Sequence, residues 1–166
     1  MSYIELHAKS AFSFLRGASF PEHLAEHAAA LGLPAIALLD RNGVYGAQRF
    51  SVACREHGVR PIIGASLTME DGVELPVLVE NRTGYANLCS LLTEAHLRSA
   101  VKGECAVSWG ELAQFAEGLI GFLGSTGRRP VASVPTVMAS GLSSSISWMC
   151  VRNALATSIG NDFASE

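Results

Sequence analysis

Strand and helix signals alternate through the first 124 residues, and this alternation constrains the fold more than any other feature of the sequence. Short apolar segments that end in turn residues alternate with longer segments whose apolar residues recur at helical spacing. The expected strands are residues 3–7, 35–39, 60–68, 74–79 and 119–123. Such alternation implies a mostly parallel sheet with right-handed crossovers. The sequence therefore predicts an α/β fold, either an open doubly wound sheet or part of a barrel, and we favour the partial barrel.

Capping and turn signals predict where the elements begin. Ser19 to Glu22 and Ser108 to Glu111 each fit a capping box, in which a serine and a glutamate satisfy free amides at a helix start. Thr83 is expected to cap the long helix between them. Asp71-Gly72 is a two-residue hairpin signal before the strand at 74–79, so the sheet should become mixed there.

The character of the sequence changes near its end. No charged residue occurs between Arg129 and Arg152, and serines accumulate in the segment SGLSSSIS. We therefore expect a domain with an incomplete barrel at residues 1–124 and an irregular or non-native tail at residues 125–166. A truncation or frameshift near residue 130 would explain the change, and an ordinary irregular terminus is the alternative.

Composition and charge exclude several classes of protein. The chain has 166 residues, of which 49% are hydrophobic, which is enough for a core. Its formal net charge of -3 argues against a generic nucleic-acid binder, because phosphate contacts need clustered Lys and Arg; any DNA role is indirect or local. The four cysteines form no C-x-x-C pair, which excludes a zinc knuckle or redox motif. Without a secretory signal or a long apolar run, we expect a cytoplasmic protein.

Polar residues stand at the expected carboxyl ends of the first three strands. His7 ends the first strand, Asp40 follows the second, and Ser66 lies in the GAS segment of the third. Functional residues of parallel α/β folds gather at these ends, so three strands point to one mouth. Two of these residues also have a structural explanation: His7 as a hydrogen-bonded strand-end residue, and Asp40 before Asn-Gly as a turn or capping residue.

Two phenylalanines follow the first expected strand. Phe12 and Phe14 alternate with serines in SAFSFLRG, a pattern that would allow their rings to stack on a nucleic-acid base. Packing of these rings in the core or within the loop is the expectation that we favour.

Three motifs resemble a known family. ELHAKSAFSFLRGAS, ALLDRNGVYGAQRF and VRPIIGASLT look like the opening motifs of the PHP domain at the N-terminus of bacterial C-family DNA polymerases. These are the replicative polymerase III alpha subunit and its error-prone paralogue, and ENRTGYANLCSLLTEAHLR extends the resemblance to about residue 124. The resemblance implies a distorted, seven-stranded β/α barrel. When active, such a barrel uses histidines and carboxylates to bind up to three divalent metals and hydrolyses phosphoesters.

The sequence departs from the metal-binding pattern of that family. His7 and Asp40 remain as candidate, vestigial ligands. Lys9 stands in place of the second histidine of a His-x-His pair, and Arg16 stands in place of a carboxylate. Arg41 and Asn42 follow Asp40 where the family has an Asp-His-Asp type motif, and Ser66 stands in place of a glutamate.

The replacements change the expected chemistry in one direction. Metal binding needs neutral imidazoles and anionic oxygens, whereas Lys9, Arg16 and Arg41 bring positive charge to the same mouth. We therefore expect a vestigial metal site converted to an ion-pair cluster, in which a cation pairs with Asp40 or another acid. Solvated basic side chains without mutual contact are the alternative.

The resemblance implies a noncatalytic PHP module of an error-prone DNA polymerase III alpha-like protein, in replication, translesion synthesis and repair. The alternatives are a metal-dependent phosphoesterase or 3'-5' exonuclease using Mn, Zn or Fe, and a free-standing interaction protein. No cofactor is expected for the noncatalytic module. The expected partners are the remainder of the polymerase and its replication and repair partners, with DNA reached only through the full-length protein and no membrane. Open barrel edges also predict self-association of the fragment.

Overall fold

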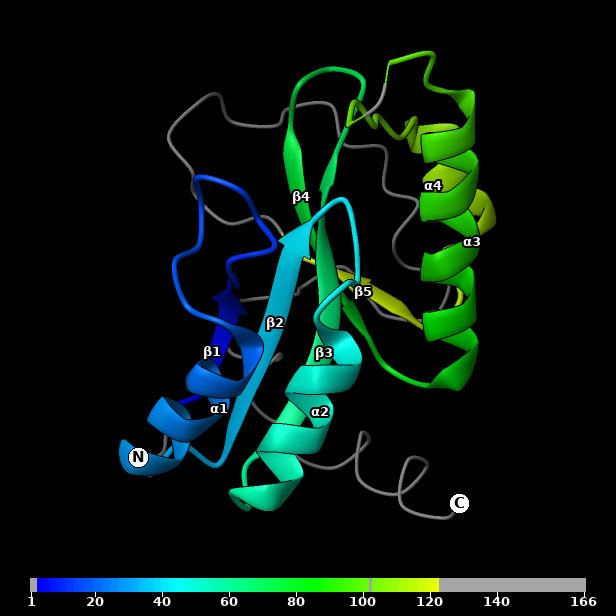
Figure 1. The fold of residues 1–166 in the computed structure, drawn as a ribbon. Helices are drawn as coiled ribbons and strands as arrows, with labels where there is room; N and C mark the ends of the chain where they lie inside the picture. The colour runs from blue at the N-terminus through cyan, green and yellow to red at the C-terminus, as the bar shows by residue number, and fades with distance from the viewer. Residues whose placement is uncertain (1–2, 102, 123–166) are drawn as a thin grey trace.

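The computed structural model describes residues 3–101 and 103–122 (Figure 1). Strands and helices alternate as predicted, and none of the described helices has the length and apolar character needed to cross a membrane. The predicted tail at 125–166 lies outside the described residues. The elements are β1 (Glu5–Ala8), α1 (Pro21–Ala30), β2 (Ala35–Arg41), α2 (Ala47–Glu56), β3 (Arg60–Thr68), β4 (Glu74–Val79), α3 (Arg82–Arg98), α4 (Trp109–Gln114) and β5 (Leu119–Gly121).

The strands form one sheet in which spatial order follows sequence order, β1-β2-β3-β4-β5. β1, β2 and β3 are parallel, whereas β4 is antiparallel to both of its neighbours, so the predicted hairpin and mixed sheet are confirmed. A doubly wound sheet reverses its strand order, and a sheet that winds toward a barrel does not. The structure therefore confirms the α/β class and the partial barrel, and the register shift between β1 and β2 is part of its distortion.

The four helices of the described residues lie on one face of the sheet. Figure 1 shows α1 and α2 in front of β2 and β3, where Ala28 and Phe50 pack against Leu38. α3 and α4 pack against β3 and β4 in a second cluster on the same face. Because successive side chains of a strand point to opposite faces, Leu39 and Leu78 belong to a third cluster on the opposite, inner face.

Two helix starts illustrate how local sequence decides a cap. At α4 the predicted capping box is present: Ser108 accepts from the Glu111 amide, and the Glu111 side chain accepts from the Ser108 amide. The box predicted at Ser19 is wrong, since α1 begins at Pro21 and Phe20 is its N-cap without a side-chain hydrogen bond. A residue before proline is held in extended conformations, as Phe20 is with ψ 154°, so Ser19 lies one position too early to cap.

The cap predicted at Thr83 is also wrong. α3 begins at Arg82, and the side chain of Asn81 accepts from the Gly84 amide at 2.9 Å. Asparagine is among the strongest N-cap residues, and it precedes the threonine in the chain. A glycine is also required at position 84 because a Cβ atom there would lie 1.9 Å from the Gly118 carbonyl oxygen.

Ser108, which caps α4, and Ser19, which caps no helix, offer a matched test of the capping geometry. We expect Ser108→Ala to lower the free energy of unfolding by about 1 kcal/mol, because it removes the side-chain acceptor of a helix amide. We expect Ser19→Ala to change it by less than about 0.5 kcal/mol, because only the Ser19 carbonyl, which accepts from Ala11, contributes to the loop. Urea unfolding of the two variants measures both effects, and equal losses would contradict the assignment.

Candidate functional site

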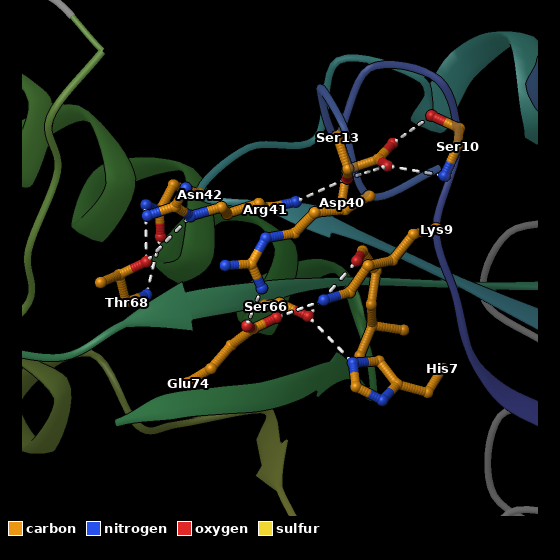
Figure 2. Close-up of polar contacts among 12 residues, drawn as sticks. His7, Lys9, Ser10, Ser13, Asp40, Arg41, Asn42, Ser66, Thr68 and Glu74 are labelled. Atoms are coloured by element: carbon orange, nitrogen blue, oxygen red, sulfur yellow. Dashed lines mark hydrogen bonds and ion pairs between the residues drawn. The ribbon is translucent and has the colours of Figure 1, made fainter. Parts of the chain in front are cut away.

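Polar side chains gather at the mouth of the sheet, where the parallel strands end. β4 runs antiparallel to β3, so the start of β4 lies at this same edge. Figure 2 shows side chains from β1, β2, β3 and β4 converging there. Four of the residues predicted from sequence, together with one acid that sequence reasoning missed, make two sets of contacts in the mouth: His7 with Ser66, and Lys9 and Arg16 with Glu74.

Glu74 is the acid that pairs with the basic side chains. One carboxylate oxygen accepts from the Lys9 ammonium, and the other accepts from Arg16 at 2.6 Å. The side chains of Lys9 and Glu74 are only 16% and 25% exposed, so this pair is sheltered from solvent. Lys9 directly follows β1 and Glu74 begins β4, so the ion pair spans a sheet in which these two strands are not neighbours.

The charges around Glu74 determine its ionisation. Burial alone would raise the pKa of the Glu74 carboxyl, but the hydrogen bond from Lys9 and the positive charges of Lys9 and Arg16 outweigh burial and lower that pKa. Glu74 is therefore ionised at neutral pH. The carboxylate of Glu74 therefore pairs with two cations, Lys9 and Arg16.

His7 lies beside this ion-pair cluster. Its Nε2 is 3.2 Å from the Ser66 hydroxyl, and its ring meets Phe122 edge to face. Ser66 is fully buried and also donates to the Leu39 carbonyl at 3.3 Å. Burial lowers the pKa of His7, and the positive charge of Lys9 lowers it further. The imidazole is therefore held in its neutral form.

Asp40 lies away from His7, although both residues are the last but one of their parallel strands. β2 extends to Arg41, so Asp40 belongs to the strand and is only 2% exposed. Its Oδ1 accepts from the Ser10 amide at 2.8 Å and the Ser13 hydroxyl at 2.6 Å, and its Oδ2 accepts from the Ser10 hydroxyl at 2.7 Å. Figure 2 shows the carboxylate turned toward these serines. Asp40 anchors the loop after β1, and it makes no ion pair with a described residue.

Arg41 and Asn42 occupy different surroundings. Arg41 is exposed, with its Nε 3.4 Å from the Thr68 hydroxyl. Asn42 is buried in the left-handed region at φ 49°, a conformation that asparagine tolerates. Its side chain accepts from the Thr68 amide at 2.7 Å and donates to the Cys105 carbonyl at 3.3 Å. Asn42 therefore ties the ends of β2 and β3 to the segment before α4.

The described residues of the mouth do not fit a divalent metal. Within residues 3–101 and 103–122, no three His, Cys, Asp or Glu side chains stand close enough together to hold one ion. The lone pairs of Glu74 and Asp40 accept hydrogen bonds from Lys9 and from serines. An ammonium group next to the neutral His7 would also repel a divalent cation.

Sequence reasoning missed Glu74 and the two serines that bind Asp40. Glu74 could have been found from the Asp71-Gly72 turn, because a hairpin returns the chain to the edge where β3 ends. Ser10 and Ser13 carry no comparable signal, since serines are common in any loop.

Fold and site together define a class: an incomplete β/α barrel with polar residues gathered at the carboxyl ends of its parallel strands. The chain belongs to the PHP domain family, whose model, described as PHP domain, matches residues 5–154. It is 50% identical over 97 residues to an error-prone DNA polymerase of Symbiobacterium thermophilum, which covers 58% of this chain and 9% of that protein.

A second relative has the same name, and one solved structure aligns with part of the chain. The chain is 43% identical over 128 residues to an error-prone DNA polymerase of Mycobacterium bovis, covering 71% of this chain and 12% of that one. It thus spans about a tenth of the length of these polymerases. A crystal structure from Bifidobacterium adolescentis, provisionally described as a metal-dependent phosphoesterase, aligns with a TM-score of 0.48 and 19% identity, over 69% of this chain and 49% of that one.

Removing the Asp40 carboxylate tests its role as an anchor. We expect Asp40→Ala to lower the free energy of unfolding by about 3 kcal/mol, because it leaves buried donors of Ser10 and Ser13 without an acceptor. Asp40→Asn keeps one acceptor oxygen and should cost less than half as much. Urea unfolding at neutral pH measures both, and an unchanged stability of Asp40→Ala would contradict the anchoring role.

The Glu74 ion pairs should make stability depend on pH. Because the folded state lowers the pKa of Glu74 below its ordinary value of 4.5, the pairs stabilise the fold fully above that pH, and the contribution is lost as the pH falls through the folded pKa. The stability difference between wild type and Glu74→Gln should therefore be largest near neutral pH and shrink as the pH falls below 4.5. Glu26→Gln, on an exposed position of α1, is the control. A difference that stays constant with pH would contradict the prediction.

Proposed function

We propose that this chain is the noncatalytic PHP module of an error-prone DNA polymerase III alpha-like protein. The relatives named error-prone DNA polymerase support the kind of protein. The observation that carries the noncatalytic assignment is the sheltered pair of Lys9 with Glu74, to which Arg16 also binds. In this proposal the cluster stands where the resemblance places the divalent metals.

The cluster would replace a metal in electrostatic terms. A metal centre holds several strands together because their anionic ligands share one cation. Here the Lys9 ammonium joins the end of β1 to β4 through Glu74, while Arg16 binds the second oxygen from the loop. The mouth can therefore keep its strands together without a bound ion. Loss of either Lys9 or Glu74 alone would leave a sheltered charge without a partner.

The role that follows is structural. We propose that the module supports the remainder of a polymerase and its replication and repair partners during translesion synthesis, in the cytoplasm and without a membrane. The chain spans about a tenth of its polymerase relatives, so nucleotide transfer would belong to other segments of such a protein. Self-association of the isolated chain remains a prediction, which light scattering after gel filtration would test.

A second candidate function is a metal-dependent phosphoesterase or 3'-5' exonuclease. One observation favours it: the lowered pKa keeps His7 neutral, the form that binds a metal. This candidate needs Mn, Zn or Fe together with ligands beyond the described residues, and it needs the ammonium of Lys9 to tolerate the ion.

Metal content and hydrolysis separate the two candidates. For chain purified without chelator, we expect far less than one Mn, Zn or Fe per molecule by mass spectrometry. We also expect hydrolysis of a phosphodiester in added manganese to be the same for wild type and His7→Ala. Stoichiometric metal and turnover that both disappear in His7→Ala would contradict the proposal and establish the enzyme.

A further inference from the structure

The loop that joins β1 to α1 carries large apolar side chains in solvent. We call residues 9–20 the aromatic loop. Phe14 and Leu15, at its tip, are 83% and 88% exposed, while Phe12 and Phe20 are 39% and 50% exposed. The expectation that these rings pack in the core or within the loop is wrong for Phe14. A soluble surface rarely exposes several large apolar residues side by side unless they bind something.

The base of the aromatic loop is fixed. Asp40 binds Ser10 and Ser13, and the Ala11 amide donates to the Ser19 carbonyl at 2.8 Å, so the two ends of the loop are joined. Gly17 comes so close to Ser10 that a Cβ atom would lie 2.1 Å from its carbonyl oxygen. The exposed tip is therefore held by a rigid frame, which lowers the entropy lost on binding a ligand.

The tip itself is strained. Leu15 has φ 60°, in the left-handed region that a bulky residue rarely adopts. No burial of the Leu15 side chain offsets this strain, because 88% of it is exposed. Such strain is typical of functional sites, where it presents side chains to a ligand.

Positive charge accompanies the rings. The Arg49 guanidinium lies 5.8 Å from the ring centres of both Phe12 and Phe20, and it also pairs with Glu22. The aromatic loop contains Lys9 and Arg16 but no acidic residue, within a chain of net charge -3. Glu74 and Glu22 are the acids that pair with these cations. Exposed Tyr45 adds a further aromatic ring near this surface, since a Cβ atom at the neighbouring Gly46 would lie 3.2 Å from the Phe12 ring.

We infer that the aromatic loop binds single-stranded DNA. Exposed rings stack on bases of any sequence, and the positive charge in excess where Lys9 and Arg16 share the single carboxylate of Glu74 attracts the phosphates, which is the usual chemistry of single-strand binding. The inference rests on the proposed place of this chain in a DNA polymerase. It departs from the expectation that DNA is reached only through the full-length protein. It agrees with the expectation from the net charge that a DNA role is indirect or local, because the aromatic loop itself carries Lys9 and Arg16 and no acid. A protein partner would need the apolar volume of Phe14 but not its ring.

Titration of a fluorescent oligothymidylate of about 12 nucleotides with the whole chain tests the inference by anisotropy. We expect saturable binding at low salt that weakens as salt rises, and weaker binding to a duplex of the same length, because its base faces are covered. Phe14→Ala should weaken single-strand binding about fivefold to a hundredfold. Phe14→Leu should weaken it nearly as much, since it keeps apolar volume and loses the ring.

Leu97→Ala is the matched control, because Leu97 is an 81% exposed apolar residue on α3, away from the aromatic loop. It should bind like wild type. The inference is overturned by absence of binding, by equal affinity for duplex, or by Phe14→Leu that binds like wild type. The DNA titration measures neither metal content nor hydrolysis, so a failure to bind DNA would leave the proposed noncatalytic function unaffected. Bound metal or hydrolysis would likewise contradict the noncatalytic function and leave the inference about DNA binding unaffected.

Discussion

The buried carboxylate of Asp40 is the interaction on which the mouth and the aromatic loop both depend. A carboxylate that is 2% exposed would be costly without partners, and here it accepts from an amide and two hydroxyls of the segment after β1. This anchor fixes the path of residues 9–20. One side of that path brings Lys9 and Arg16 to Glu74, and the other side carries Phe14 into solvent.

The fold was predictable where the signal is local and repeated. Alternation of apolar segments predicts the strands and helices, and the Asp71-Gly72 turn predicts the antiparallel step. Strand order is not encoded in this way, since a doubly wound sheet and a barrel use the same crossover units; the sequential order had to come from the structure. The prediction of a helix cap fails when a neighbouring residue fixes the backbone. Pro21 holds Phe20 extended, so the N-cap position falls at Phe20 and not at Ser19.

The site was predictable in its location and less so in its contacts. The predicted strand ends placed His7 and Ser66 at the mouth, and in the structure the Nε2 of His7 lies 3.2 Å from the Ser66 hydroxyl oxygen. Asp40 lies near the end of the strand between them but faces the serines of the loop, because its side chain follows the alternation of β2 toward the opposite face. The partner of Lys9 is Glu74, which lies 65 positions later in sequence; such a pair depends on three-dimensional strand order, which local patterns do not contain.

The charge pattern of the mouth explains why its replacements belong together. Histidines and carboxylates gathered for a metal repel one another or lose solvation when no metal is bound, which destabilises the fold. In the function proposed here, a lysine at position 9 takes the place of one such ligand and supplies a covalently attached cation, so the carboxylate of Glu74 has a partner at any metal concentration. Arg16 adds a second donor to the same carboxylate. In the function proposed here, the stability of the module is therefore independent of metal supply, a useful property for a domain whose task is support.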